Sequence, residues 1–362
     1  MKPLIILLTI FFISCSRNKE AIVVQYVASS GAELLSSPVF DHIEVLILHG
    51  EGAPLLGNIN MIVKNDTYYT EDQRLSKIHL FDATGKYLHS VGERGRGFGE
   101  YLSFGSMIVE ENGDISIFSS QQKSLFTYSS QGDFLGSTKY PHGGYFNKMN
   151  GFNYHYYGHG SGMPYQLYIV DGQEHVIDSC LVSFNVVNVD DAPFSAFGDA
   201  LNLTPYYGGD VYRLFDGKVS IAYKFDFGAY NIPDKYFTFS DMFEAFDFLL
   251  PKTHASKHRF FENQKYAILQ AIIGNMEQEW GRAIYGLLEK ATSTWSWYYM
   301  QDGDFMNSYC LKYMDDSYVY FTADPELMKQ TSGMIQRFPL LNTLTDNDNI
   351  VILRCKMASA NL

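Results

Sequence analysis

The chain has 362 residues, of which 46% are hydrophobic, so it can bury a large core. Tyr and Phe contribute 27 residues each, against only three Trp, and this aromatic excess favours β structure. The formal net charge of −13 would repel a polyanion, and no stretch rich in Lys and Arg offsets it, so nucleic acid is excluded as a partner.

The N-terminus is predicted to be an export signal that covers residues 1–14. Lys2 precedes an apolar run from Leu4 to Ile13, which is shorter than the roughly 20 residues that a membrane-spanning helix needs. The run ends in "FFISCS", which resembles the lipobox of bacterial lipoproteins. This resemblance implies that a lipid is attached to Cys15. The alternative is an ordinary secretory signal with an incidental cysteine.

Residues 15–38 are predicted to be a lipidated tether that joins the anchor to the folded domain. A lipid on Cys15 would hold the protein at a membrane without a transmembrane helix. Ser16, rather than Asp, follows this cysteine, which suggests the outer membrane of a Gram-negative cell. The membrane is therefore one expected partner, and the face of the membrane stays open.

Residues 39–362 are predicted to form one domain of repeated β-hairpins. "IHLFDATGKYLHSV" (78–91) aligns with "LFTYSSQGDFLGST" (125–138) when Gly85 is placed over Gly132, 47 residues further on. Each copy has a strand, a polar turn that ends in Gly, and a second strand. That spacing is the length of one blade of a β-propeller. Weaker copies follow, with turns at Asp171-Gly172, Asp216-Gly217 and Asp315-Asp316, and a last strand in "NIVILRC" (349–355).

Four glycines in "GERGRGFGEY" (92–101) have the spacing of a phosphate-binding loop. Such a loop needs a helix after it to present its N-terminal amides to the anion. The following residues instead alternate like a strand, so we interpret Gly92 to Gly99 as a crossing between two blades. Arg94 and Arg96 are expected to pair with Glu93, with Glu100 or with exposed carbonyl groups.

The segment 257–300 permits two interpretations. Apolar residues recur at helical spacing and several residues favour helix. The runs "KYAILQAIIG" and "RAIYGLLEKATSTWSWYYM" would also form one more hairpin at the expected place in the repeat. We favour strands, because the repeat context outweighs local propensity.

The stretches "IHLFDATGKYLHSVGERGRGFGEY", "YKFDFGAYNIP" and "DNDNIVILRCKM" resemble bacterial six-bladed β-propeller lipoproteins related to NHL-repeat and TolB-like propellers. Phe98 stands where this family pattern often has Pro. The resemblance implies an all-β fold, a six-bladed β-propeller of four-stranded antiparallel blades. We expect the first and last strands of the domain to share one blade.

Aromatic residues near predicted turns are candidate ligand-binding residues, because exposed rings offer flat stacking surfaces. The alternative is that these rings fill the core between blades. His155 and His159 are four residues apart, but the glycines around them argue against a metal-binding helix. The candidates are Tyr156, Tyr157, His159, Tyr206, Tyr207, Trp295 and Trp297.

No catalytic motif is found in the sequence, and we assign no catalytic residue, metal ligand or cofactor. Cys180, Cys310 and Cys355 match no zinc pattern and are expected to be buried free thiols, although one disulfide is possible. The functional hypothesis is an outer-membrane lipoprotein that acts as a binding or scaffold module. A propeller face or the channel mouth would bind a glycan, a small molecule or a protein. The alternative is a propeller lyase or metal-dependent hydrolase with its site in the channel.

Overall fold

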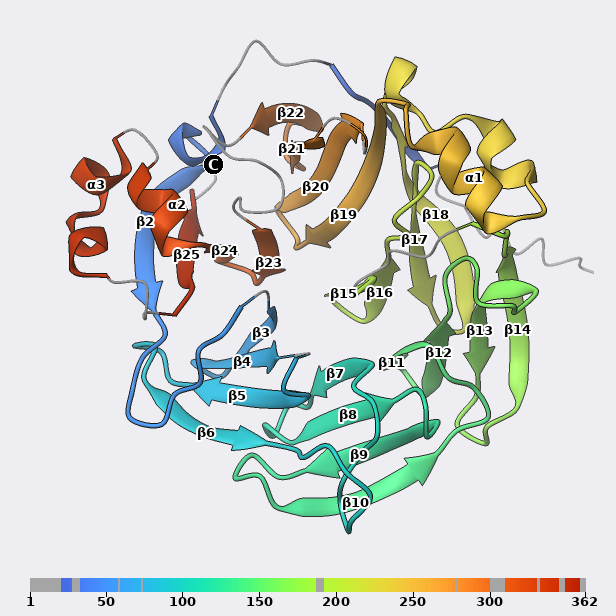
Figure 1. Cartoon of the computed structure of the whole chain (residues 1–362), viewed down its shortest axis with the longest axis horizontal. Helices are drawn as coiled ribbons and strands as arrows, with labels where there is room; N and C mark the ends of the chain where they lie inside the picture. The colour runs from blue at the N-terminus through green and yellow to red at the C-terminus, as the bar shows by residue number, and fades with distance from the viewer. Residues whose placement is uncertain are drawn as a thin grey trace, which may run out of the picture.

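The computed structural model describes residues 21–27, 33–57, 59–72, 74–186, 192–275, 277, 279–299, 310–330, 333–344 and 349–358. Six β-sheets form a ring around a central axis (Figure 1). In each sheet four antiparallel strands follow one another from the centre outwards. The chain is therefore an all-β, six-bladed β-propeller, which confirms the prediction.

The first three blades follow chain order without exchange of strands. Blade 1 consists of β3 (Asn60–Lys64), β4 (Thr67–Asp72), β5 (Lys77–Phe81) and β6 (Tyr87–Val91). Blade 2 consists of β7 (Ser106–Val109), β8 (Ile115–Ser119), β9 (Ser124–Tyr128) and β10 (Phe134–Lys139). Blade 3 consists of β11 (Tyr145–Met149), β12 (Phe152–Tyr156), β13 (Tyr165–Val170) and β14 (Val176–Val182).

The remaining blades contain the two ends of the domain. Blade 4 consists of β15 (Phe194–Phe197), β16 (Ala200–Leu203), β17 (Asp210–Phe215) and β18 (Lys218–Asp226). Blade 5 consists of β19 (His254–Glu262), β20 (Tyr266–Asn275), β21 (Glu279–Glu289) and β22 (Thr294–Tyr299). Blade 6 consists of β23 (Cys310–Met314), β24 (Tyr318–Ala323), β25 (Val351–Met357) and β2 (Phe40–Ile47).

Blade 6 closes the ring. Its outermost strand β2 comes from the start of the domain and pairs antiparallel with β25, with Ile47 opposite Val351 and Ile43 opposite Cys355. This arrangement confirms the prediction that the first and last strands share a blade. It also joins the two ends of the domain through backbone hydrogen bonds.

Part of the segment assigned to the tether belongs to the fold. Strand β1 (Ile22–Gln25) pairs parallel with the outer strand of blade 4, with Ile22 opposite Tyr223. Leu34 and Leu35 begin the short helix η1 (Leu34–Ser36) and are buried in the core of blades 5 and 6. Cys15 and the export signal lie outside the described residues.

The duplicated turns adopt one geometry in blades 1 and 2. Gly85 has φ +83° and Gly132 has φ +94°, a region that favours glycine over residues with a Cβ atom. The amide of Gly85 bonds to the carbonyl of Asp82, and the amide of Gly132 bonds to the carbonyl of Ser129. The sequence repeat therefore corresponds to the outer hairpins of consecutive blades.

The ambiguous segment forms strands, as favoured. Residues 257–299 supply most of β19, β20, β21 and β22, which pair in consecutive antiparallel order. Their apolar residues, such as Ile268 and Tyr285, are fully buried between blades 5 and 6. Burial on both faces of the sheet produces the apolar runs that also suit a helix.

Residues 92–105 connect blade 1 to blade 2, which confirms the interpretation of the glycine-rich stretch. Gly92 and Gly99 have positive φ angles of +83° and +74°. Glu93 pairs with Lys77 at 2.6 Å, and a carboxylate oxygen of Glu100 accepts the amide hydrogen of Gly97 at 2.6 Å. These partners differ from the expected pairs with Arg94 and Arg96.

Helices occur only outside the blades within the described part of the chain. α1 (Met242–Leu249), η2 (Gly228–Tyr230) and η3 (Asp234–Thr238) lie between blades 4 and 5 (Figure 1). α2 (Pro325–Gln330), α3 (Met334–Arg337) and η5 (Pro339–Thr343) lie between β24 and β25. No helix among the described residues is long and apolar enough to cross a membrane. Cys180, Cys310 and Cys355 form no disulfide bond, but only Cys355 is buried, so the expectation of burial is wrong for Cys180 and Cys310, which are partly exposed.

Candidate functional site

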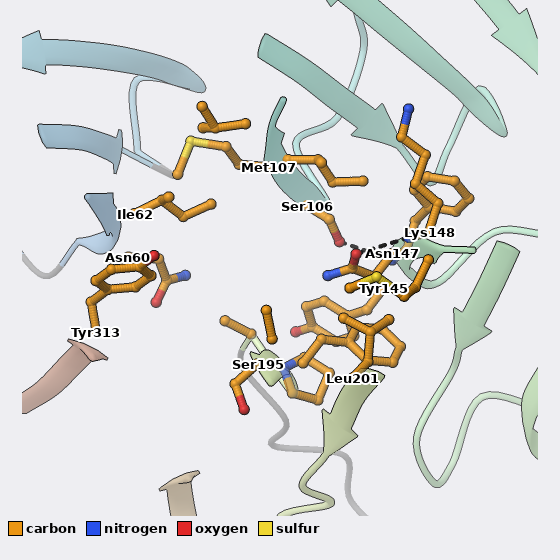
Figure 2. A pocket seen from close by; sticks show the side chains of 18 of the residues that line it. Asn60, Ile62, Ser106, Met107, Tyr145, Asn147, Lys148, Ser195, Leu201 and Tyr313 are labelled. Atoms are coloured by element: carbon orange, nitrogen blue, oxygen red, sulfur yellow. Dashed lines mark hydrogen bonds between the residues drawn. The ribbon is translucent and has the colours of Figure 1, made fainter. Parts of the chain in front are cut away.

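A cavity of about 1020 Å³ occupies the centre of the ring. Its wall includes residues from the inner strands of all six blades, namely β3, β7, β11, β15, β19 and β23. Figure 2 shows Asn60, Ile62 and Tyr313 on one side, with Ser106, Asn147 and Tyr145 across from them. Because six separate segments converge here, the channel is the candidate functional site.

Blades 2, 3 and 4 contribute an uncharged wall to the channel, apart from the charged residues at the mouth that are described below. We call it the uncharged arc, and it presents amide, hydroxyl, aromatic and thioether groups. Ser106 Oγ accepts the amide hydrogen of Phe146 at 2.9 Å, so this hydroxyl also fixes the start of β11. The arc comprises Ser106, Met107, Tyr145, Asn147, Met149 and Ala196.

The wall contributed by blades 5, 6 and 1 carries the buried charges, and we call it the charged arc. Arg259 on β19, Lys312 on β23 and Glu71 on β4 are 3%, 4% and 4% exposed. Each of them is engaged by neighbouring groups. Arg259 Nη2 donates to Asn60 Oδ1 at 2.7 Å, and so links blade 5 to blade 1 past the inner strand of blade 6.

Two β-bulges position the cations of the charged arc. The register of β19 shifts between Lys257 and Arg259, and that of β23 shifts between Leu311 and Tyr313. A bulge bends a strand and redirects a side chain, and bulges occur preferentially beside functional sites. Each cation of the arc is therefore next to or within an irregularity of its inner strand.

Paired charges border one mouth of the channel, where the inner strands end. Lys64 lies 2.7 Å from Glu111, and Lys148 lies 2.6 Å from Glu110. These pairs link blade 1 to blade 2 and blade 2 to blade 3. They are partly or largely exposed, so solvent screens them and they add little to stability.

Asp315, Asp316 and Tyr313 complete the wall near the turn after β23. The carboxylate of Asp315 accepts hydrogen bonds from the amides of Ser317 and Tyr318, both at 2.7 Å. Asp316 is exposed. Burial raises the pKa of Tyr313 to about 12, so its phenol is neutral and can donate a hydrogen bond near pH 7.

The seven predicted ligand-binding residues lie away from the cavity. Tyr156 is fully buried in the core of blades 3 and 4, and its hydroxyl donates to Gln166. Tyr157 is half-buried, and its hydroxyl accepts the amide hydrogen of Gly143 at 2.7 Å. For Tyr156 the structure matches the core alternative rather than the stacking surface.

His159, Tyr206 and Tyr207 are brought together beside the insertion that contains α1. The ring centroids of His159 and Tyr207 are 6.5 Å apart, and those of Tyr206 and Tyr207 are 5.0 Å apart. His159 Nδ1 accepts the amide hydrogen of Phe184 at 3.2 Å, and burial lowers the pKa of this histidine to about 4. His155, in contrast, lies in β12 with its Nδ1 atom 3.2 Å from the carbonyl of Gly143.

Trp295 and Trp297 lie between blades 4 and 5. The ring of Trp297 packs edge-on against Tyr26 at 5.0 Å, and its indole nitrogen donates to the carbonyl of Gln25 at 3.2 Å. Trp297 thus holds the segment that follows β1. Trp295 packs edge-on against Phe225 at 5.2 Å.

Asp72, His79 and Ser90 form a row of polar side chains in blade 1 that no sequence motif marks. Ser90 Oγ lies 2.6 Å from His79 Nδ1, and His79 Nε2 lies 4.0 Å from a carboxylate oxygen of Asp72. Because Ser90 faces His79 across adjacent strands, cross-strand pairing is enough to bring the two together. Asp72 also accepts the amide hydrogen of Leu75 at 3.0 Å, which holds the tight turn between β4 and β5.

No group of three or more His, Cys, Asp or Glu residues suited to hold a metal ion occurs within the described ranges. The channel residues were not found from the sequence. The one signal for them is position, because each inner strand begins a blade after a connection, such as 92–105, from the outer strand of the preceding blade. Successive residues of those strands, such as Ser106 and Met107, line the cavity.

A family model described as "Domain of unknown function (DUF4934)" matches residues 21–356, so the chain belongs to this family. No curated protein matches the chain.

The solved structures that share the fold include two from Bacteroides species. One is a "Putative exported protein" from Bacteroides fragilis, with 15% identity and a TM-score of 0.74, and the match covers 93% of this chain and 100% of that one. The other is a member of the DUF4221 family from Bacteroides vulgatus, with 11% identity and a TM-score of 0.56, and the match covers 88% of this chain and 97% of that one.

Proposed function

We propose that this DUF4934 propeller is a non-catalytic binding protein whose central channel holds a small amphipathic molecule. The observation that carries the proposal is the cavity of about 1020 Å³, whose wall combines aromatic, thioether, amide and hydroxyl groups. Ligand sites of proteins are typically concave, mostly apolar and furnished with a few placed polar groups. The seven predicted ligand-binding residues are not among those that line this cavity.

A fluorescence titration with 8-anilinonaphthalene-1-sulfonate tests the proposal. Ala196 lies on the inner strand β15, is exposed and lines the cavity, so Ala196→Trp should fill part of the channel. We expect saturable binding of one probe molecule per chain, and loss of that binding in Ala196→Trp.

Ser137→Trp is the matched control, because Ser137 is exposed on the outer strand β10. It should leave probe binding unchanged. Equal binding by Ala196→Trp and the parent protein would contradict the proposal. Recovery of a chemically altered candidate ligand after incubation would instead indicate the alternative, a propeller enzyme.

We also propose that the protein is exported and held at the outer membrane by a lipid on Cys15. The lipobox-like "FFISCS" and the fold shared with a protein named as exported support this proposal. Metabolic labelling with an alkynyl palmitate should mark the parent protein and the control Cys180→Ala, but not Cys15→Ala. Label on Cys15→Ala would contradict the anchor.

A further inference from the structure

The two arcs of the channel wall differ in charge, and this difference bears on the chemistry of the ligand. Inside the mouth, the charged arc holds two buried cations, Arg259 and Lys312, and one buried anion, Glu71. The other lining charges are the mouth pairs and the two aspartates beyond β23. The three buried charges of the wall therefore sum to +1, and the two less buried aspartates bring the whole lining to −1, within a protein of formal net charge −13.

The two cations lie on inner strands that contact each other. β19 and β23 are the inner strands of neighbouring blades, and Arg259 bonds to Asn60, the cross-strand partner of Glu71. Arg259, Asn60 and Glu71 therefore form one linked polar stretch of wall, and Lys312 lies on β23, which contacts both β19 and β3. A charge in a poorly solvated site interacts more strongly with a ligand than the same charge at a surface.

The opposite arc complements this polar stretch. Met107, Tyr145 and Met149 offer thioether and ring surfaces without a buried charge. An apolar molecule gains free energy roughly in proportion to the surface that it buries there. A guanidinium group and an ammonium group recognise carboxylates and other oxyanions.

We infer that the channel selects an amphipathic anion, a molecule with one oxyanion group and an apolar, ring-containing body. The oxyanion lies toward Lys312 and Arg259, and the body lies against the uncharged arc. This inference depends on the proposed function, because it names the ligand class of the same channel.

Two probes with the same ring system test the inference in the purified protein. 8-Anilinonaphthalene-1-sulfonate carries an anionic group, and N-phenyl-1-naphthylamine lacks it. We expect the anion to bind about tenfold more tightly or better, the size of one hydrogen bond to a charged group. Lys312→Met should remove about tenfold from the affinity for the anion and leave that for the neutral probe within about twofold.

Two further variants keep the test decisive if Lys312→Met does not fold. Lys312→Arg retains the charge and should retain the preference for the anion. Glu71→Gln removes the opposing charge of the arc and should strengthen anion binding while leaving the neutral probe unaffected. Melting curves and circular dichroism establish that each variant is folded.

The outcomes separate the two proposals. Equal affinity for both probes, with both lost in Ala196→Trp, would overturn the amphipathic-anion inference and leave channel binding supported. An affinity for the anion that Lys312→Met and Glu71→Gln both leave unchanged would also overturn it. Binding of both probes that survives Ala196→Trp would overturn the proposed function itself.

Discussion

Blades 1 and 2 contain the same sequence repeat, but blade 1 packs against blade 6 through different side chains from those by which blade 2 packs against blade 1. The interface of blades 1 and 2, here the internal seam, packs Phe126 and Tyr69 in one apolar cluster. The interface of blades 6 and 1, here the closing seam, packs Tyr68 against Tyr320 and also holds the row of Asp72, His79 and Ser90. Phe126 stands 47 residues after His79, so equivalent positions carry a benzene ring and an imidazole.

The difference shows that the repeat determines the backbone but not the chemistry of the seam. The closing seam also contains Asn349, whose side chain accepts from Leu56 at 2.6 Å and donates to Pro54 at 2.9 Å. Polar contacts of this kind require one relative position of the two segments, whereas apolar packing tolerates several. We expect the two seams to respond differently to matched substitutions.

Exchanging the residues at the equivalent positions 79 and 126 should change the free energy of unfolding the most. Phe126→His places a polar ring in an apolar cluster and should lower the free energy of unfolding by about 4 kcal/mol. His79→Phe removes the bond to Ser90 and should cost about 1 kcal/mol. Urea denaturation measures both. Equal costs would show that the two seams are energetically alike.

The two turn glycines provide the next comparison. A Cβ atom on Gly85 would collide with the carbonyl oxygen of Ile47 in blade 6, whereas one on Gly132 would lie 3.5 Å from Val91. Gly85→Ala and Gly132→Ala both place a residue with a Cβ atom at a positive φ angle, which lowers stability, but only Gly85→Ala also requires the backbone to move. Gly85→Ala should cost about 3 kcal/mol and Gly132→Ala about 1 kcal/mol. A larger cost for Gly132→Ala in thermal or urea unfolding would contradict this reasoning.

Loss of the Asn349 side chain should weaken the closing seam by an intermediate amount. Asn349→Ala leaves the amide of Leu56 and the carbonyl of Pro54 without this partner, at a cost of about 2 kcal/mol. Tyr101→Phe is the counterpart in the internal seam, where the hydroxyl of Tyr101 donates to the carbonyl of Ser76, and should cost about 1 kcal/mol. Hydrogen exchange in β2 and β25 should accelerate only in Asn349→Ala.

The smallest expected difference between the two seams is in how the free energy of unfolding depends on acid pH. Burial lowers the pKa of His79 from its usual 6.5, so between that value and the folded value the unfolded chain binds the extra proton. Stability is therefore full above pH 6.5 and falls as the pH drops below it. His155 and His159, whose pKa values burial lowers to about 3 and about 4, extend the loss further into acid.

His79→Phe should make the decline between pH 6.5 and pH 5 shallower, because one titrating group is removed. Phe126→Leu, in the internal seam, should leave the shape of the decline unchanged. Unfolding free energies measured at several pH values test this. Parallel curves for the parent and His79→Phe would contradict the assignment.

Much of the fold could be predicted because its signals are local. Polar turns at Gly85 and Gly132, the Asp-Gly turns and the last strand each lie within one short segment. The strand β1 could not be predicted, because Ile22–Gln25 acquires its partner only when blade 4 is formed. The helix α1 lies in an insertion between blades, which the repeat pattern does not cover.

The candidate site was less predictable for a physical reason. Asn60, Ser106 and Asn147 are ordinary polar residues in three separate strands, and only the closure of the ring brings them to one cavity. The aromatic pairs stood out because they are adjacent in the sequence. Tyr156 is the last residue of β12 and enters the core, whereas Tyr157 lies just beyond the strand and bonds to the loop at Gly143.

The pairing of β2 with β25 has a consequence for how the protein is made. A ribosome releases Phe40–Ile47 roughly 300 residues before it releases Val351–Met357, and joining such distant segments carries a loop-closure entropy. During synthesis β2 therefore lacks its native partner strand, and its backbone donors and acceptors are available to other chains. Any polypeptide that stops short of Val351 leaves the ring open at this point.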